Sequence, residues 1–144
     1  MRKNWKKAKK DDLDRNVVHL VRILNSFPGI QTIGSCGGHP NPDPCQWSEG
    51  SFYVKFHVAW NAEGRLSLEF LAWLINDMVV RTTTKGNVLL LPVSPPPYLN
   101  DPGNCLCFVI EGSNGADPEE LAETMDEAKT KCFVQSEDDG NACG

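Results

Sequence analysis

Residues 51–60 are Ser-Phe-Tyr-Val-Lys-Phe-His-Val-Ala-Trp, and this stretch decides the class of fold. Apolar side chains alternate with Tyr53, Lys55 and His57. A two-residue period of this kind is typical of a β-strand with one buried and one wet face. The chain is therefore expected to build a sheet that is covered on one side.

Three helices are predicted around this strand. Apolar side chains in residues 13–27 recur at three- and four-residue steps behind an Asp-rich first turn. Residues 66–80 are apolar nearly all round, which predicts a central helix pressed into the core. The last helix is expected to start at Asp117 as N-cap, with Pro118 in the first helical position and Glu120 at capping-box spacing.

Further strands are predicted at residues 30–35, 87–93 and 105–111. Four prolines preclude a regular element in residues 94–104. The order is then α-β-β-α-β-β-α, an α/β domain of the α+β type. We expect a sandwich with one mixed four-stranded sheet and helices packed on it, in which a right-handed crossover makes the second and third strands parallel.

Length and composition predict one folded domain. The chain has 144 residues, of which 40% are hydrophobic and 23% charged, as in ordinary globular domains. We expect a basic disordered arm at 1–10, a single domain at 11–133 and an acidic disordered tail at 134–144. The apolar stretches are too short to span a membrane, and acidic residues follow the basic start where a signal peptide would be apolar. We therefore expect a cytoplasmic protein whose six cysteines are reduced.

The long loop at 34–50 is expected to lie beside the turns at 82–86 and 112–115, forming one rim. A Gly-rich turn that opens a helix offers free N–H groups to an anion, and paired glycines let a backbone approach a ligand closely. The predicted ligand-binding residues are Ser35, Cys36, Gly37, Gly38, His39, Gly112, Ser113 and Asn114.

The pair Cys36 and His39 leaves three interpretations open. With Cys45 as a third donor they could bind zinc, but no fourth ligand is evident, so we expect no metal. Cys36 could instead be a nucleophile that His39 activates. In the simplest interpretation Cys36 is a small buried group, the glycines form a tight turn and His39 lies in an exposed loop.

Residues 24–28, Leu-Asn-Ser-Phe-Pro, followed by Thr-Ile-Gly-Ser-Cys-Gly-Gly at 32–38, resemble the tRNA wybutosine-synthesizing methyltransferases that act third in that pathway. The resemblance extends in outline over residues 17–129. It implies that family's fold, S-adenosylmethionine as cofactor and a tRNA substrate. His39 stands where the family has a loop arginine, and Ala59-Trp60 replaces its His-Asp pair.

The charge balance weighs against nucleic acid as a partner. The net charge is −5 and the basic residues concentrate in the first ten positions, whereas binding RNA phosphates needs a basic face. We therefore predict a pocket for a small-molecule or nucleotide-like ligand and leave open whether the protein is an enzyme. The alternatives are an S-adenosylmethionine-dependent tRNA methyltransferase and a zinc-stabilised interaction module.

Overall fold

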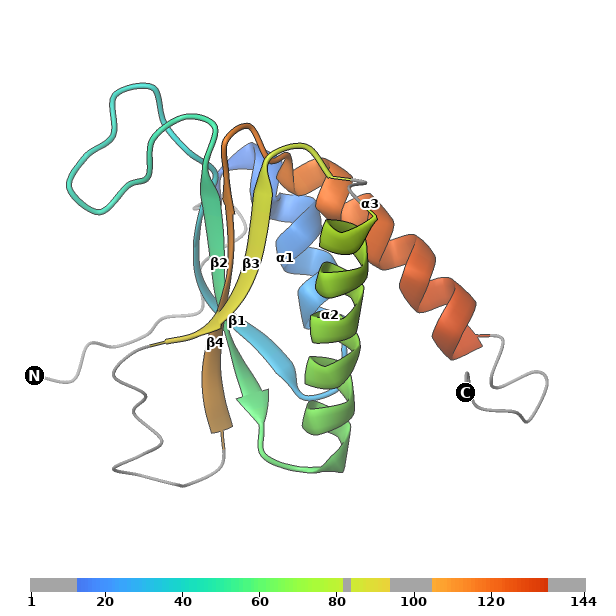
Figure 1. Ribbon diagram of the computed structural model, residues 1–144. Helices are drawn as coiled ribbons and strands as arrows, with labels where there is room; N and C mark the ends of the chain where they lie inside the picture. Colours follow the sequence, from blue (N-terminus) through green and yellow to red (C-terminus); the bar gives the residue numbers. More distant parts are fainter. Residues whose placement is uncertain (1–12, 82–83, 94–104, 135–144) are drawn as a thin grey trace, which may run out of the picture.

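The computed structural model describes residues 13–81, 84–93 and 105–134 (Figure 1). The predicted arm at 1–10 and the proline-rich segment at 94–104 lie outside the described residues. Of the predicted tail at 134–144, only Val134 is described.

The described residues form three α-helices and four strands, so the α+β class is confirmed. In chain order they are a 3-10 turn η2 (Arg15–Val17), α1 (Val18–Asn25), β1 (Ile30–Cys36), β2 (Phe52–Ala59), α2 (Ala62–Val80), β3 (Asn87–Pro92), β4 (Cys105–Ser113), α3 (Pro118–Lys129) and a π-helical turn η4 (Thr130–Val134).

The four strands form one sheet in the order β1-β2-β4-β3, and every neighbouring pair is antiparallel. The expectation of a mixed sheet is therefore wrong. β2 and β3 do run in the same direction, as the crossover through α2 requires. They are not neighbours, however, because β4 turns back from β3 and occupies the place between them.

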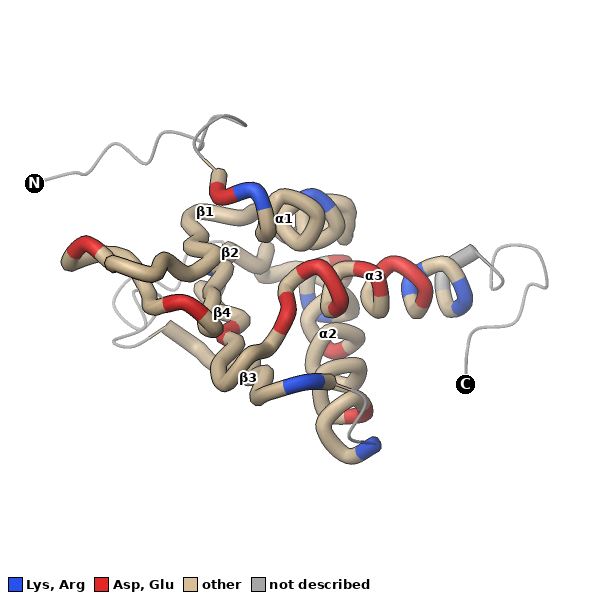
Figure 2. The backbone as a smooth tube through the Cα atoms, turned by 90° about the horizontal axis from the view of Figure 1, so that it is seen from above, with Lys and Arg blue, Asp and Glu red and all other residues tan. Residues whose placement is uncertain are grey.

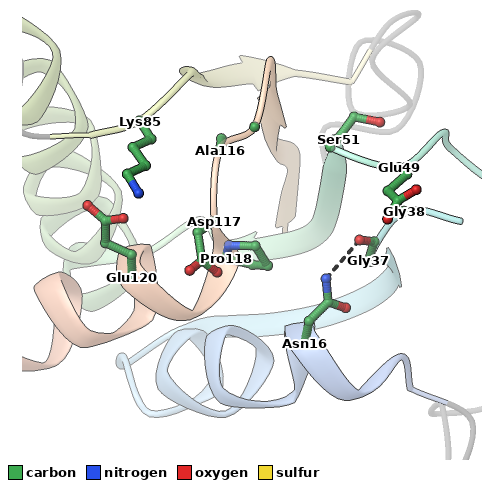
Figure 3. Close-up of a pocket in the computed structure, with 12 residues that line it drawn as sticks. Asn16, Gly37, Gly38, Glu49, Ser51, Lys85, Ala116, Asp117, Pro118 and Glu120 are labelled. Atoms are coloured by element: carbon green, nitrogen blue, oxygen red, sulfur yellow. Dashed lines mark hydrogen bonds between the residues drawn. The ribbon is translucent and has the colours of Figure 1, made fainter. Parts of the chain in front are cut away.

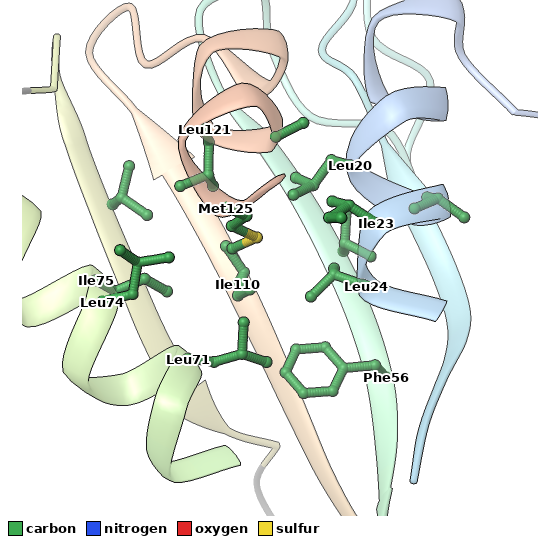
Figure 4. Packing of buried hydrophobic residues seen from close by; sticks show 14 of the residues in the cluster. Leu20, Ile23, Leu24, Phe56, Leu71, Leu74, Ile75, Ile110, Leu121 and Met125 are labelled. Atoms are coloured by element: carbon green, nitrogen blue, oxygen red, sulfur yellow. The ribbon is translucent and has the colours of Figure 1, made fainter. Parts of the chain in front are cut away.

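The helices cover one face of the sheet, and the core lies between the two layers (Figures 1 and 4). The alternate side chains of β2 that were predicted to be buried are completely inaccessible. They meet apolar side chains from all three helices. The central contacts involve Leu20, Leu24, Phe56, Leu71, Ile110, Leu121 and Met125.

The prediction that α2 is pressed into the core, rather than lying on its surface, is correct for only one face of the helix. Leu71, Leu74, Ile75 and Met78 face the sheet, but Trp73 is 52% exposed. Within the described part of the chain no second layer covers the outer side of this helix. α2 therefore carries more apolar surface than the sheet can bury. No helix among the described residues is long and apolar enough to cross a membrane.

Candidate functional site

The loop between β1 and β2 and the turn between β4 and α3 meet at one end of the sheet. Phe52 at the start of β2 pairs with Gly112 near the end of β4. The Gly115 N–H donates a 3.0 Å hydrogen bond to the carbonyl oxygen of Gly50. Gly86, before β3, lies so close to this turn that a Cβ there would be 2.2 Å from the Ser113 carbonyl oxygen. These contacts bring the three segments of the predicted rim together.

A cavity of about 430 Å³ lies between these segments (Figure 3). Its size falls within the range of small-ligand pockets, roughly 300–1,000 Å³. We call it the rim pocket. It is lined by Asn16, Gly37, Gly38, Glu49, Gly50, Ser51, Lys85, Gly115, Ala116, Asp117, Pro118 and Glu120.

Of the eight predicted ligand-binding residues, only Gly37 and Gly38 line the rim pocket. Gly112 packs against the core, where an added Cβ would lie 2.0 Å from the Phe52 ring. The other predicted residues are Ser35 and Cys36 at the end of β1, His39 in the first loop, Ser113 at the end of β4 and Asn114 in the turn that follows it. The predicted segments thus come together in the structure, but most of the residues that line the pocket are other residues of those segments or residues next to them in the sequence.

Gly37 and Gly38 form one wall of the rim pocket, which we call the glycine wall. Two residues of the first turn, which sequence reasoning missed, hold this wall in place. The Asn16 amide Nδ2 donates to the Gly37 carbonyl oxygen at 2.8 Å. The Gly37 N–H donates to Asp14 Oδ2, also at 2.8 Å. The sequence signal is the Asp-rich first turn, whose acidic residues the pattern assigns to the start of the helix. Asp14 occupies the N-cap position of η2 but makes no side-chain capping bond there. Its carboxylate accepts the Gly37 N–H of the loop instead.

The opposite wall of the rim pocket is the start of α3. The Asp117 side chain accepts the Glu119 N–H at 2.9 Å, and Pro118 has no N–H to offer. The predicted anion-binding position is thus partly filled by the protein's own carboxylate. Figure 2 shows acidic residues at this helix start.

A second cluster lies beside the glycine wall and contains Asp14, Cys36 and His39. Each offers one ligand atom, and the three atoms lie within 4.8 Å of one another. His39 Nε2 is 3.0 Å from Asp14 Oδ2. The sequence predicted Cys45 as the third donor beside Cys36 and His39. In the described residues the third donor is Asp14 instead, and Cys45 is exposed on the loop that carries His39.

The backbone around this cluster is firmly held. The His39 N–H donates to the Trp47 carbonyl oxygen at 2.8 Å, and the His39 carbonyl oxygen accepts the Glu49 N–H at 3.0 Å. The Cys36 Sγ accepts the Trp47 N–H at 3.4 Å. Cys36 is buried, as the simplest interpretation expected, but His39, which that interpretation placed in an exposed loop, is only partly exposed.

Tyr53 of β2 borders the cluster. Burial raises the pKa of its phenol, and electrostatic interaction with Cys36, Cys45 and Asp14 raises it further. Its ring also packs against Trp47, with the centroids 5.0 Å apart. These surroundings make ionisation of the Tyr53 phenol less favourable than that of a free tyrosine.

A scan of protein-family models, a search of curated proteins and a search of solved structures each found no match to this chain. The resemblance to the wybutosine-synthesizing methyltransferases accordingly stays a prediction. The function has to be argued from the rim pocket and the cluster beside it.

Proposed function

We propose that the protein is a binding domain that holds a small zwitterionic, nucleoside-like molecule in the rim pocket. The observation that carries this proposal is the combination of two unlike walls. Gly37 and Gly38 present backbone without side chains on one side, and charged side chains of both signs face them from the other.

The glycine wall suits a flat or apolar part of a ligand. The wall is a backbone surface, because the space that a Cβ would take is already filled by Asn16 Oδ1 at Gly37 and by the Ser51 carbonyl oxygen at Gly38. Its position is fixed by the bonds of Gly37 to Asp14 and Asn16. A preformed wall lowers the ordering cost of binding.

The charged wall selects against polyphosphates. Asp117, Glu120 and a single lysine, Lys85, line the side opposite the glycines, and Glu49 lines the pocket beside Gly38 (Figure 3). In Figure 3 the Lys85 and Glu120 side chains point toward one another. A ligand with both an ammonium and a carboxylate group can satisfy the two signs, whereas a polyphosphate would meet mostly like charge.

S-adenosylhomocysteine and ATP are suitable probes because both carry adenosine and differ in charge. We expect S-adenosylhomocysteine to bind weakly, with a Kd of about 1 mM, and ATP to bind about tenfold more weakly still, a difference of about 1.4 kcal/mol. Chemical-shift changes in the amide spectrum of the labelled protein measure both. The changes should centre on Gly37, Gly38 and Gly115.

Substitutions at the charged wall test the electrostatic argument. Glu120→Gln should reduce the difference in affinity between S-adenosylhomocysteine and ATP, because it removes one negative charge from the pocket. Glu123→Gln is the matched control, since Glu123 is exposed on the same helix and does not line the pocket. Equal or tighter binding of ATP by the unaltered protein would refute the proposal.

RNA provides a separate prediction. We expect tRNA to bind only through the lysines of residues 1–10, because the described pocket is rich in carboxylates. Replacing these five lysines by glutamine should abolish tRNA binding and leave S-adenosylhomocysteine binding intact. A gel-shift titration at two salt concentrations measures this. Salt-resistant tRNA binding by the substituted protein would favour the tRNA-methyltransferase alternative.

A further inference from the structure

We propose that Asp14, Cys36 and His39 form a Zn²⁺ site next to the rim pocket. This inference does not depend on the proposed function. It reverses the expectation from the sequence, in which Cys45 was the third donor and no metal was expected.

The donor set selects the class of metal. A thiolate, an imidazole and a carboxylate are ligands that zinc accepts together. Hard cations such as Mg²⁺ and Ca²⁺ prefer oxygen donors alone. The sulfur and nitrogen of this cluster therefore favour zinc over either of them.

The distances are close to those of a bound site. Zinc bonds of about 2.0–2.3 Å in a tetrahedral arrangement place neighbouring ligand atoms roughly 3.3–3.8 Å apart. Here one ligand atom from each residue lies within 4.8 Å of the others, and one pair, Asp14 Oδ2 and His39 Nε2, is 3.0 Å apart in a hydrogen bond. Binding one ion requires side-chain rotations that exchange this hydrogen bond for bonds to the metal.

Backbone groups around the cluster orient the ligands. The Gly37 N–H donates to Asp14 Oδ2, and the Trp47 N–H donates to Cys36 Sγ. His39 is fixed through both its N–H and its carbonyl oxygen. Such outer contacts set the direction of metal ligands, and losing one typically weakens metal binding by about 10–100-fold.

The exposure of the cluster suits an open coordination position. Cys36 is 3% exposed, whereas the side chains of Asp14 and His39 are 34% and 28% exposed. A metal can therefore reach the site from solvent. Three protein ligands with a position left for water or a substrate are the pattern of catalytic zinc, while structural zinc has four protein ligands.

The fold should not depend on this metal. None of the three ligands belongs to the main core cluster. Chelation is therefore expected to remove zinc while the circular dichroism spectrum stays that of the folded protein.

Metal titration of the full chain tests the proposal. After reduction and chelator treatment, the protein is titrated with Zn²⁺ against a chromogenic chelator, and separately with Co²⁺. We expect one equivalent of Zn²⁺ per chain. Co²⁺ should give a thiolate-to-cobalt charge-transfer band together with the visible bands of tetrahedral cobalt.

Variants assign the ligands. Cys36→Ala should abolish the charge-transfer band, and His39→Ala and Asp14→Asn should each weaken Zn²⁺ binding at least about 100-fold. His39 is partly exposed, so its variant remains informative if Cys36→Ala fails to fold. Cys45→Ser is the control and should keep both the band and the affinity.

Three outcomes would overturn the proposal. They are no stoichiometric Zn²⁺ binding by the unaltered protein, unchanged binding by His39→Ala, and loss of the charge-transfer band in Cys45→Ser rather than in Cys36→Ala. The last result would show that the exposed cysteine binds the metal on its own.

Discussion

Replacing Phe56 by alanine is expected to lower the free energy of unfolding by about 3–5 kcal/mol. Phe56 is completely inaccessible in β2, and its ring stacks on that of Phe108 with the centroids 6.5 Å apart. It lies where the helices meet the sheet (Figure 4). Truncation leaves a cavity that the rigid sheet cannot close. Since domains of this kind are stable by about 5–15 kcal/mol, the variant should lose much of its stability.

Urea denaturation followed by circular dichroism measures this loss. Lys55→Ala is the matched control, because Lys55 is the preceding residue on the same strand and is exposed on the other face. We expect it to change the free energy of unfolding by less than about 1 kcal/mol. Similar losses in the two variants would show that the assignment of the buried face of β2 is wrong.

The secondary structure could be predicted closely because it follows from local patterns. The alternation in residues 51–60 corresponds to the strand Phe52–Ala59. The capping residues Asp117 and Pro118 mark the start of α3 as expected. The order of strands was not accessible in the same way, since a period of two indicates which face is buried but not which strand lies alongside.

The start of α2 illustrates a different limit. The apolar pattern begins at residue 66, but the helix begins at Ala62. Asn61 caps it by accepting the Gly64 N–H at 2.9 Å. Gly64 is needed because an added Cβ would lie 1.9 Å from the Ala59 carbonyl oxygen. An apolar pattern cannot reveal a cap or a close backbone approach that lies outside it.

The candidate site was predictable only in part for a similar reason. Glycine pairs and Gly-rich turns signal a loop rim through backbone properties that are local to the sequence. The Asp14 and Asn16 side chains reach Gly37 across 23 and 21 positions of the chain. Such contacts exist only once α1 has packed beside β1. The cluster of Asp14 with Cys36 and His39 is therefore a product of tertiary structure.

Gly38 lines the rim pocket and precedes His39 of the proposed zinc site, so Gly38→Ala is expected to impair binding at both. Its backbone has φ +90°, and an added Cβ would lie 2.4 Å from the Ser51 carbonyl oxygen and 2.9 Å from that of Ser48. Both neighbours are backbone atoms, which cannot rotate away. A side chain in this conformation costs about 1–3 kcal/mol, so the loop must either accept that strain or change its path.

We expect Gly38→Ala to lower the free energy of unfolding by about 1–3 kcal/mol and to weaken binding of both Zn²⁺ and S-adenosylhomocysteine. A changed path would move His39, the next residue, away from Asp14 and would displace the wall that Gly37 forms. Gly34→Ala is the control. Gly34 lies in β1 with no atom within 4 Å of an added Cβ, and alanine in a strand costs no more than glycine. Urea denaturation and the two binding titrations compare the variants. Full retention of stability and of both ligands in Gly38→Ala would mean that the loop from 37 to 51 does not adopt the conformation on which the pocket and the metal site depend.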